Sequence, residues 1–217
     1  TSRSYANSGT YNVVLSVINN YGCKNSKTKE IIVAAEPRIT KQPNGGIICQ
    51  GTSHDLISDV NPGGAGSLSY QWYFNNQPIS NSNNLKYTIS SMSAANAGTY
   101  YLKVTNAQCN LFAQTETVTV SYQEKPNASF NIGGKSFNAC VNDAEYTFMN
   151  TTPPLANVSY LWSTSDGGTS RETNFTYKFT NTGVYDITLT ATVGGCSSGA
   201  VPPLGNTNNR IRVNGLP

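Results

Sequence analysis

The sequence predicts an all-β protein made of tandem antiparallel β-sandwiches, and two observations carry this prediction. Leu, Glu and Lys are scarce, whereas Tyr, Val, Ile and Thr recur at every second position, a pattern that favours strands over helices. One motif also occurs three times: Gly-x-Tyr, then alternating apolar residues, then a short turn and a cysteine. Its copies lie at residues 8–23, 96–109 and 182–196. A motif repeated in this way indicates related modules in a row.

The repeats divide the 217 residues into three modules. Residues 1–35 hold the final hairpin of a partial first module. No Trp-bearing strand precedes this hairpin, so we expect it to pack on its neighbour or to have its missing half upstream. Residues 36–122 form the second module, near the usual sandwich size of about 100 residues. Residues 123–217 form the third, and the link at 123–126 is short enough to restrain the two modules.

Each module shows its strands as short alternating segments separated by Gly, Asn, Ser or Pro. The segments expected to supply strands are 9–19 and 27–35 in the first module, and 144–152, 158–168, 174–193 and 209–215 in the third. In the second module they are 51–60, 68–80 (a strand and its turn), 85–106 (two strands with the bend between them) and 113–122.

The second module resembles the immunoglobulin-like family in its segments YQW, AGTYYLKV and TVTV. The resemblance implies that Trp72 is the buried tryptophan of the third strand and that Tyr100 is the corner tyrosine. The module departs from the family at both core cysteine positions, where Leu102 and, on our alignment, Ser58 stand instead.

The third module resembles the PKD family. Trp162, Asp166 and Gly167 match its W-D-F-G-D-G motif, although the first Asp and the first Gly of that motif are lost. Gly183 and Tyr185 match the later G-x-Y segment of the family. The resemblance implies that Trp162 and Tyr185 are structural core residues.

Five cysteines are present, and none of them belongs to a CxxC pair. Metal ligands would need to cluster at short spacing, and the chain has a single histidine, so a metal site is disfavoured. Disulfides are the better interpretation, and they imply an oxidising compartment. The odd number leaves at least one cysteine free or paired outside this chain.

Strand polarity argues against one disulfide within each module, that is, against Cys49–Cys109 and Cys140–Cys196. In a sandwich of this type the second and sixth strands run parallel, with one cysteine before the second strand and the other after the sixth. At ~3.3 Å per residue these positions lie tens of Å apart, whereas a disulfide needs Cα atoms within about 7 Å. In modules joined head to tail, Cys49 faces Cys196 instead, which predicts an inter-domain disulfide between them. The partners of Cys23, Cys109 and Cys140 are then outside the fragment or unknown.

Candidates for catalysis are weak, so we expect no enzyme, no cofactor and no metal. His54 lies in an expected strand beside Asp55, with no nucleophile motif near it. Asp166 offers one carboxylate, short of the six to eight oxygens that calcium takes. Two acidic pairs would need a cleft that slim sandwiches rarely form; they are Asp55 with Asp59 and Asp143 with Glu145.

Charge and hydropathy argue against a nucleic-acid-binding protein and against a membrane-spanning segment. The charged residues make up 12% of the chain and the net charge is +3, which predicts no nucleic-acid partner. No run of 18 apolar residues occurs, so we expect no membrane insertion in this fragment. A polar, weakly charged, Tyr-rich composition is common among extracellular β proteins.

Immunoglobulin-like and PKD modules in alternation, each with one cysteine before the second strand and one after the sixth, resemble the giant surface proteins of gliding Bacteroidetes, which are type IX secretion substrates. The resemblance implies a non-catalytic repeat segment of a cell-surface adhesin that serves adhesion or gliding motility as a stiff stalk. Its implied partners are neighbouring modules and polysaccharide or other surface ligands. The alternative is a spacer or carbohydrate-binding arm of a secreted hydrolase.

Overall fold

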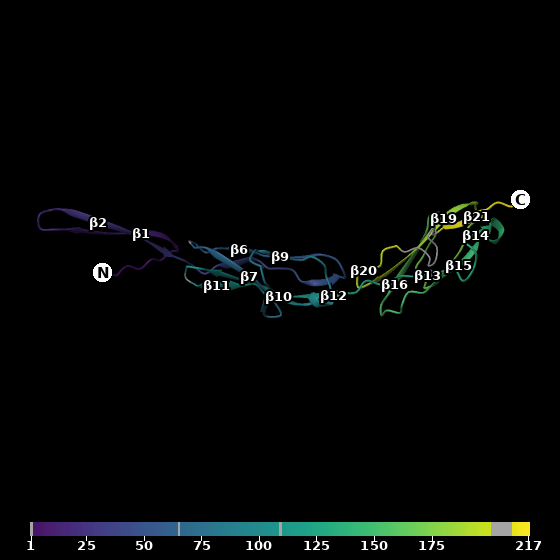
Figure 1. Ribbon diagram of the computed structural model, residues 1–217, viewed down its shortest axis with the longest axis horizontal. Coiled ribbons are helices and arrows are strands. Elements are labelled where there is room, and N and C mark those ends of the chain that lie inside the picture. Colours follow the sequence, from purple (N-terminus) through teal and green to yellow (C-terminus); the bar gives the residue numbers. More distant parts are fainter. Residues whose placement is uncertain (1, 65, 109, 201–209) are drawn as a thin grey trace. The chain divides into compact units, whose positions relative to one another are not determined.

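The structure, a computed structural model, describes residues 2–64, 66–108, 110–200 and 210–217. Its regular elements are strands apart from two short 3-10 turns, so the predicted class of tandem antiparallel β-sandwiches is confirmed (Figure 1). The chain divides into two compact units, residues 1–122 and 123–217, and each is described by itself.

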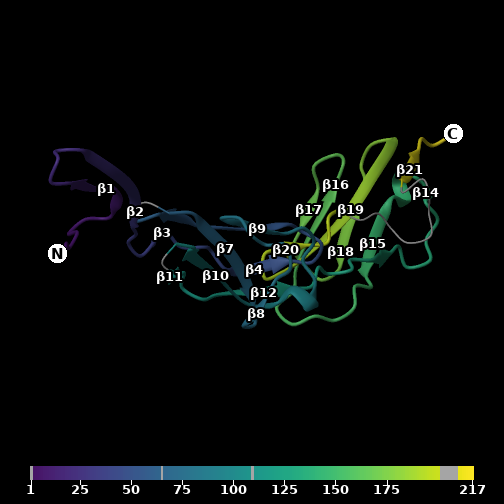
Figure 2. The same cartoon turned by 60° about the vertical axis from the view of Figure 1, so that its left-hand side comes forward.

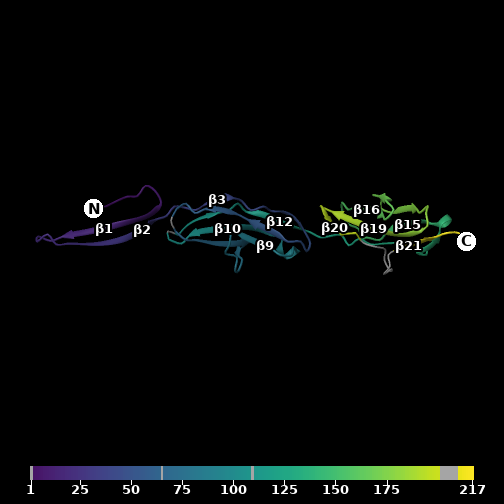
Figure 3. The ribbon, with the colours of Figure 1, turned by 90° about the horizontal axis from the view of Figure 1, so that it is seen from above.

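The first unit begins with a two-stranded antiparallel sheet made of β1 (Gly9–Ile18) and β2 (Lys24–Val33), seen as a paired ribbon in Figure 3. The turn between the strands is closed by Asn19, whose Oδ1 accepts hydrogen bonds from the backbone N–H groups of Tyr21 and Cys23, both at 3.0 Å. Gly22 in this turn has a φ of 81°, which glycine adopts without strain. Among the described strands, β1 pairs with β2 alone.

The rest of the first unit is a sandwich. One sheet has the strand order β4-β12-β10-β7-β8, with β11 also paired to β10, and the facing strands form the ladders β3–β6 and β5–β9. Its strands are β3 (Arg38–Lys41), β4 (Gly46–Cys49), β5 (His54–Ile57), β6 (Asp59–Asn61), β7 (Leu68–Phe74), β8 (Gln77–Pro78), β9 (Lys86–Ile89), β10 (Gly98–Asn106), β11 (Leu111–Gln114) and β12 (Val118–Gln123). Its buried core consists of Leu56, Trp72, Ile89, Met92, Tyr100, Leu102, Val104 and Val120.

The closing strand of this sandwich is broken into two pieces, which corrects the single strand expected at 113–122. Both β11 and β12 pair with β10, and the buried Thr115 lies between them. The Thr115 hydroxyl accepts a hydrogen bond from the backbone N–H of Leu102 at 2.9 Å, and the Thr115 N–H donates to the Leu102 carbonyl at 2.9 Å. The side chain therefore takes the place of one backbone acceptor in the ladder. The strand also runs to Gln123, so the link between modules is shorter than expected.

The second unit is a sandwich with sheets in the order β14-β21-β19-β16-β17 and β13-β15-β18, and Figure 2 shows β16 beside β19. Its strands are β13 (Phe130–Asn131), β14 (Asn138–Cys140), β15 (Glu145–Asn150), β16 (Ser159–Thr164), β17 (Thr169–Ser170), β18 (Phe175–Lys178), β19 (Gly183–Val193), β20 (Cys196–Ser197) and β21 (Arg210–Asn214). Aromatic rings dominate the core: the rings of Phe130 and Trp162 meet edge to face with their centroids 4.9 Å apart.

Candidate functional site

All three copies of the Gly-x-Tyr motif make the same corner hydrogen bond. In each copy the tyrosine hydroxyl donates to the backbone carbonyl of an asparagine four residues earlier, which fixes the bend that leads into the strand. The three bonds are Tyr11 to Asn7 at 2.8 Å, Tyr100 to Asn96 at 2.8 Å, and Tyr185 to Asn181 at 2.9 Å. Burial, with a smaller contribution from Tyr87, raises the pKa of Tyr100 to about 12.

The strand register repeats with the motif. In each module the glycine of the motif lies opposite a valine of the last strand: Gly9 opposite Val33, Gly98 opposite Val120, and Gly183 opposite Val213. The β1–β2 hairpin thus corresponds, residue by residue at this end, to the last two strands of each complete sandwich.

The two tryptophans occupy matching places. Trp72 and Trp162 are both fully buried. The indole N–H of Trp72 donates to the Asn84 carbonyl at 2.9 Å, and that of Trp162 donates to the Glu172 carbonyl at 3.0 Å. A buried indole N–H without a partner would be costly, so these two bonds help to fix the orientation of each ring.

The two positions where an immunoglobulin-type domain holds its core cysteines are both buried here. Leu102 and Ser58 have no exposed surface. The Ser58 hydroxyl has no hydrogen-bond partner within the part of the chain that the structure describes. The core of the second module therefore has packed side chains where an immunoglobulin-type domain has a disulfide, and one buried hydroxyl there is unpaired.

The described cysteines occupy two kinds of position. Cys49 and Cys140 are the last residues of β4 and β14, and each stands five residues before the next core strand, β5 or β15. Cys23 and Cys196 follow the turn after β1 and β19. Cys109 lies outside the described residues.

The register of the third module separates its two cysteines. Cys140 lies opposite Asn214 at one end of β21, beside the start of β19, whereas Cys196 lies opposite Val193 at the far end of β19. At ~3.3 Å per residue the length of β19 is about 35 Å, far beyond the reach of a disulfide. In agreement, Cys196 takes part in a disulfide and Cys140 is an exposed free thiol.

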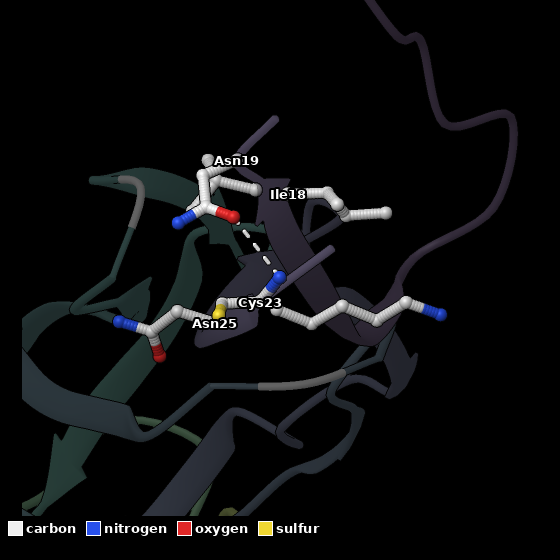
Figure 4. A pocket seen from close by; sticks show the side chains of 6 residues that line it. Ile18, Asn19, Cys23 and Asn25 are labelled. Carbon is white, nitrogen blue, oxygen red and sulfur yellow. Dashed lines mark hydrogen bonds between the residues drawn. The ribbon is translucent and has the colours of Figure 1, made fainter. Parts of the chain in front are cut away.

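The same contrast holds in the first unit, where Cys49 takes part in a disulfide and Cys23 is an exposed free thiol. Cys23 lines a hollow together with Val17, Ile18 and Lys24. Figure 4 shows Cys23 beside Asn19, whose side chain is hydrogen-bonded to the Cys23 backbone. Each of the two kinds of cysteine position thus has one bonded and one free member among the described residues.

The residues considered for catalysis make structural contacts. His54 Nε2 lies 2.9 Å from the carbonyl oxygen of Asn44. Asp55 accepts a hydrogen bond from Thr88 at 2.6 Å and pairs with the Lys86 ammonium at 2.8 Å. The hydrogen bonds from Lys86 and then from Thr88 lower the pKa of Asp55 from its ordinary value. A carboxylate held ionised on the surface in this way is a poor general acid.

Asp143 and Asp166 organise turns, whereas Asp59 lies opposite Lys41 in the ladder of β3 and β6. Asp143 pairs with Lys135 at 3.2 Å, and the same ammonium also donates to the backbone carbonyl of Glu145. Asp166 accepts hydrogen bonds from Thr164 and Tyr177, which hold the turn between β16 and β17. Among the described residues no three His, Cys, Asp or Glu side chains gather as a metal site would require.

The second and third modules match known families. Residues 29–121 match the family model of the immunoglobulin domain, and residues 123–201 match that of the PKD domain. These matches confirm the resemblance of the two modules to the immunoglobulin-like and PKD families. No curated protein matches the chain. Within the described residues no helix is long and apolar enough to cross a membrane.

Several solved structures resemble the chain at low identity. A three-immunoglobulin fragment of titin with an E-to-A mutation is 16% identical with a TM-score of 0.50, and the match covers 97% of this chain and 75% of the titin chain. An I-band fragment of titin is 15% identical with a TM-score of 0.49 over the same shares. Fibronectin(III)-like modules of Clostridium thermocellum CbhA are 12% identical with a TM-score of 0.45, over 82% of this chain and 94% of theirs. The match to the mutated titin fragment, at a TM-score of 0.50, shows a shared fold and nothing more.

Proposed function

We propose that this chain is a non-catalytic repeat segment of a long extracellular surface adhesin, in which stapled modules act as a stiff stalk for adhesion or gliding motility. Three features support the proposal: the tandem immunoglobulin-like and PKD modules, the structural contacts made by His54, Asp55, Asp143 and Asp166, and the described cysteines. The four described cysteines carry it, because they stand at or next to strand ends in a repeated pattern and belong to neither of the core clusters around Trp72 and Trp162.

The staple we propose is a disulfide between Cys49 and Cys196. Both residues take part in disulfides, whereas Cys23 and Cys140 are free. Cys109 can be the partner of at most one of the two bonded cysteines, so only their mutual pairing provides both with a partner in this chain. The bond closes a loop of roughly 150 residues, which restricts the unfolded chain by about 5 kcal/mol in the chain-entropy account.

The same rule extends the stalk in both directions. In this pattern the cysteine that ends β4 or β14 bonds to the cysteine after the β1 or β19 turn of the next module. Cys140 would then bond to a module that follows, and Cys23 to a module that precedes. Cys109 would likewise join the preceding module. The partners in this proposal are therefore neighbouring modules of the same protein. Disulfides of this kind persist in oxidising surroundings, which supports an extracellular location.

Surface display and mechanical role are tested together on intact cells. An antibody raised against residues 123–217 should label cells whose membranes are not permeabilised, and deletion of the segment from the full-length protein should impair adhesion or gliding. Labelling only after permeabilisation would contradict surface display. Normal adhesion and gliding after the deletion would contradict the stalk role, and Cys49→Ser in the full-length protein distinguishes loss of the staple from loss of the modules.

A further inference from the structure

One face of strand β1 is apolar and exposed, although the corresponding face is covered in both complete sandwiches. Gly9 and Tyr11 have the spacing of Gly183 and Tyr185, and their strands share a register. Successive residues of β1 therefore correspond to successive residues of β19. The inward residues of β19 are buried, with exposed fractions of 1% for Ile187, 0% for Leu189 and 0% for Ala191, whereas their counterparts are 38% exposed for Val13, 67% for Leu15 and 56% for Val17.

The edge of β1 that lies away from β2 is also free of strands in the described residues. In the complete sandwiches this edge bears the strand with the tryptophan: β7 pairs with β10, and β16 pairs with β19. Trp162 of that strand lies opposite Leu189, the counterpart of Leu15. The free edge and the uncovered face of β1 thus lie where the complete sandwiches have the tryptophan-bearing strand.

We propose that this surface is the docking site for the preceding strands of its own module, which include a strand that pairs with the free edge of β1 and places a tryptophan across from Leu15. The corner bond from Tyr11 to Asn7 is already formed at 2.8 Å, so the hairpin has the shape it would need in a complete sandwich. The inference goes beyond the proposed stalk, because it assigns a surface and its occupant and does not depend on how the cysteines pair.

Charge argues against a second copy of the hairpin as the occupant. Lys27 and Lys29 on β2 lie directly across from Leu15 and Val13, so the apolar stripe of β1 does not continue onto β2 at these two positions. Two hairpins stacked face to face would bring four lysines together, which opposes association. A strand that docks on the β1 side leaves the ammonium groups at the rim, where they stay in water.

The chain itself supplies a surrogate for the missing strands. Residues 123–182 end in Asn181-Thr182, and residues 7–8 are Asn7-Ser8, so a copy of 123–182 can be joined directly to Gly9 with the corner asparagine kept in place. We would compare this extended chain with the original 217-residue chain under reducing conditions, by hydrogen exchange and by sedimentation. Protection of the β1 amides should rise by ~100-fold or more in the extended chain, because they become part of a cooperatively folded sandwich.

Two matched substitutions sharpen the comparison. Leu15→Ser should abolish the added protection, whereas Val14→Thr should leave it, since Val14 corresponds to the outward Thr188. In the original chain neither change should alter protection or mass. Failure of the extended chain to protect β1 would overturn the proposal. If the original chain forms dimers and Leu15→Ser makes it monomeric, the occupant of the surface is a second copy of the chain, and the proposal is overturned.

Discussion

Trp72 on β7 lies directly across from Leu102 on β10, at the position where an immunoglobulin-type domain holds a core cysteine. The indole therefore has an aliphatic side chain as its cross-strand partner in place of a disulfide. Trp162 and Leu189 repeat the relationship in the third module. Neither core cluster includes a cysteine, and the described cysteines stand at or next to the ends of strands.

Each tryptophan should support its own module alone. Trp72→Ala and Trp162→Ala each leave a large cavity in a fully buried core and should lower the free energy of unfolding of that module by about 3–5 kcal/mol. The chain has two tryptophans, so in each variant the remaining one reports on the other module by its fluorescence. Loss of native emission from Trp162 in the Trp72→Ala variant would show that the modules do not fold independently.

The buried hydroxyl of Ser58 should cost stability. Ser58→Ala removes an unpaired polar group from the core, so we expect the free energy of unfolding of the second module to rise by about 1 kcal/mol. Denaturant unfolding followed by Trp72 fluorescence measures this change. Ser198→Ala is the matched control in the third module, because the Ser198 hydroxyl accepts a hydrogen bond from the Ala191 N–H at 3.2 Å and its removal should destabilise. A destabilised Ser58→Ala variant would mean that the hydroxyl has a partner.

The corner tyrosines should each contribute one hydrogen bond. Tyr100→Phe leaves a partly buried carbonyl without its donor and should lower the free energy of unfolding of its module by about 1–3 kcal/mol, whereas Tyr185→Phe removes an exposed bond and should cost about 0.5–1.5 kcal/mol. Tyr21→Phe serves as the control, because Tyr21 is 86% exposed and should have no measurable effect. If all three variants are as stable as the unchanged chain, the corner hydrogen bond does not stabilise its module.

The second module should lose stability in alkali. The pKa of Tyr100 is raised from 10.0 to about 12, chiefly by burial, so the folded state holds this proton more tightly than the unfolded chain. This contribution is complete below about pH 10 and is lost as the pH rises from 10 toward 12. Denaturant midpoints measured across this range should fall in the native chain, and they should fall less steeply in Tyr100→Phe. Identical slopes would contradict the assignment.

The sequence predicted much of this architecture because its signals are local. The Gly-x-Tyr spacing, the alternation in strands and the two tryptophans are local features of the sequence, and they predicted the class of fold and the two types of module. The break of the closing strand at Thr115 was not predicted, since it depends on a hydrogen bond to Leu102 from a residue thirteen positions away.

Other contacts had no sequence signal at all. The Tyr146 hydroxyl donates to the Ser136 carbonyl at 2.7 Å, and a backbone carbonyl can belong to any residue type. The Asn75 side chain accepts a hydrogen bond from the Thr99 N–H at 2.9 Å, which secures the start of β10 from a distant turn. Such bonds depend on how strands that are remote in sequence meet, and composition or periodicity carries no information about them.

The pairing of the cysteines tests the central claim most directly. Peptide mapping of the 217-residue chain, digested without reduction and with free thiols blocked, should yield a cross-linked peptide that contains Cys49 and Cys196, together with blocked Cys23 and Cys140. That result would establish the staple on which the stiff stalk depends. Recovery of Cys49 linked to Cys109, together with Cys140 linked to Cys196, would contradict it and would place each disulfide within a single module.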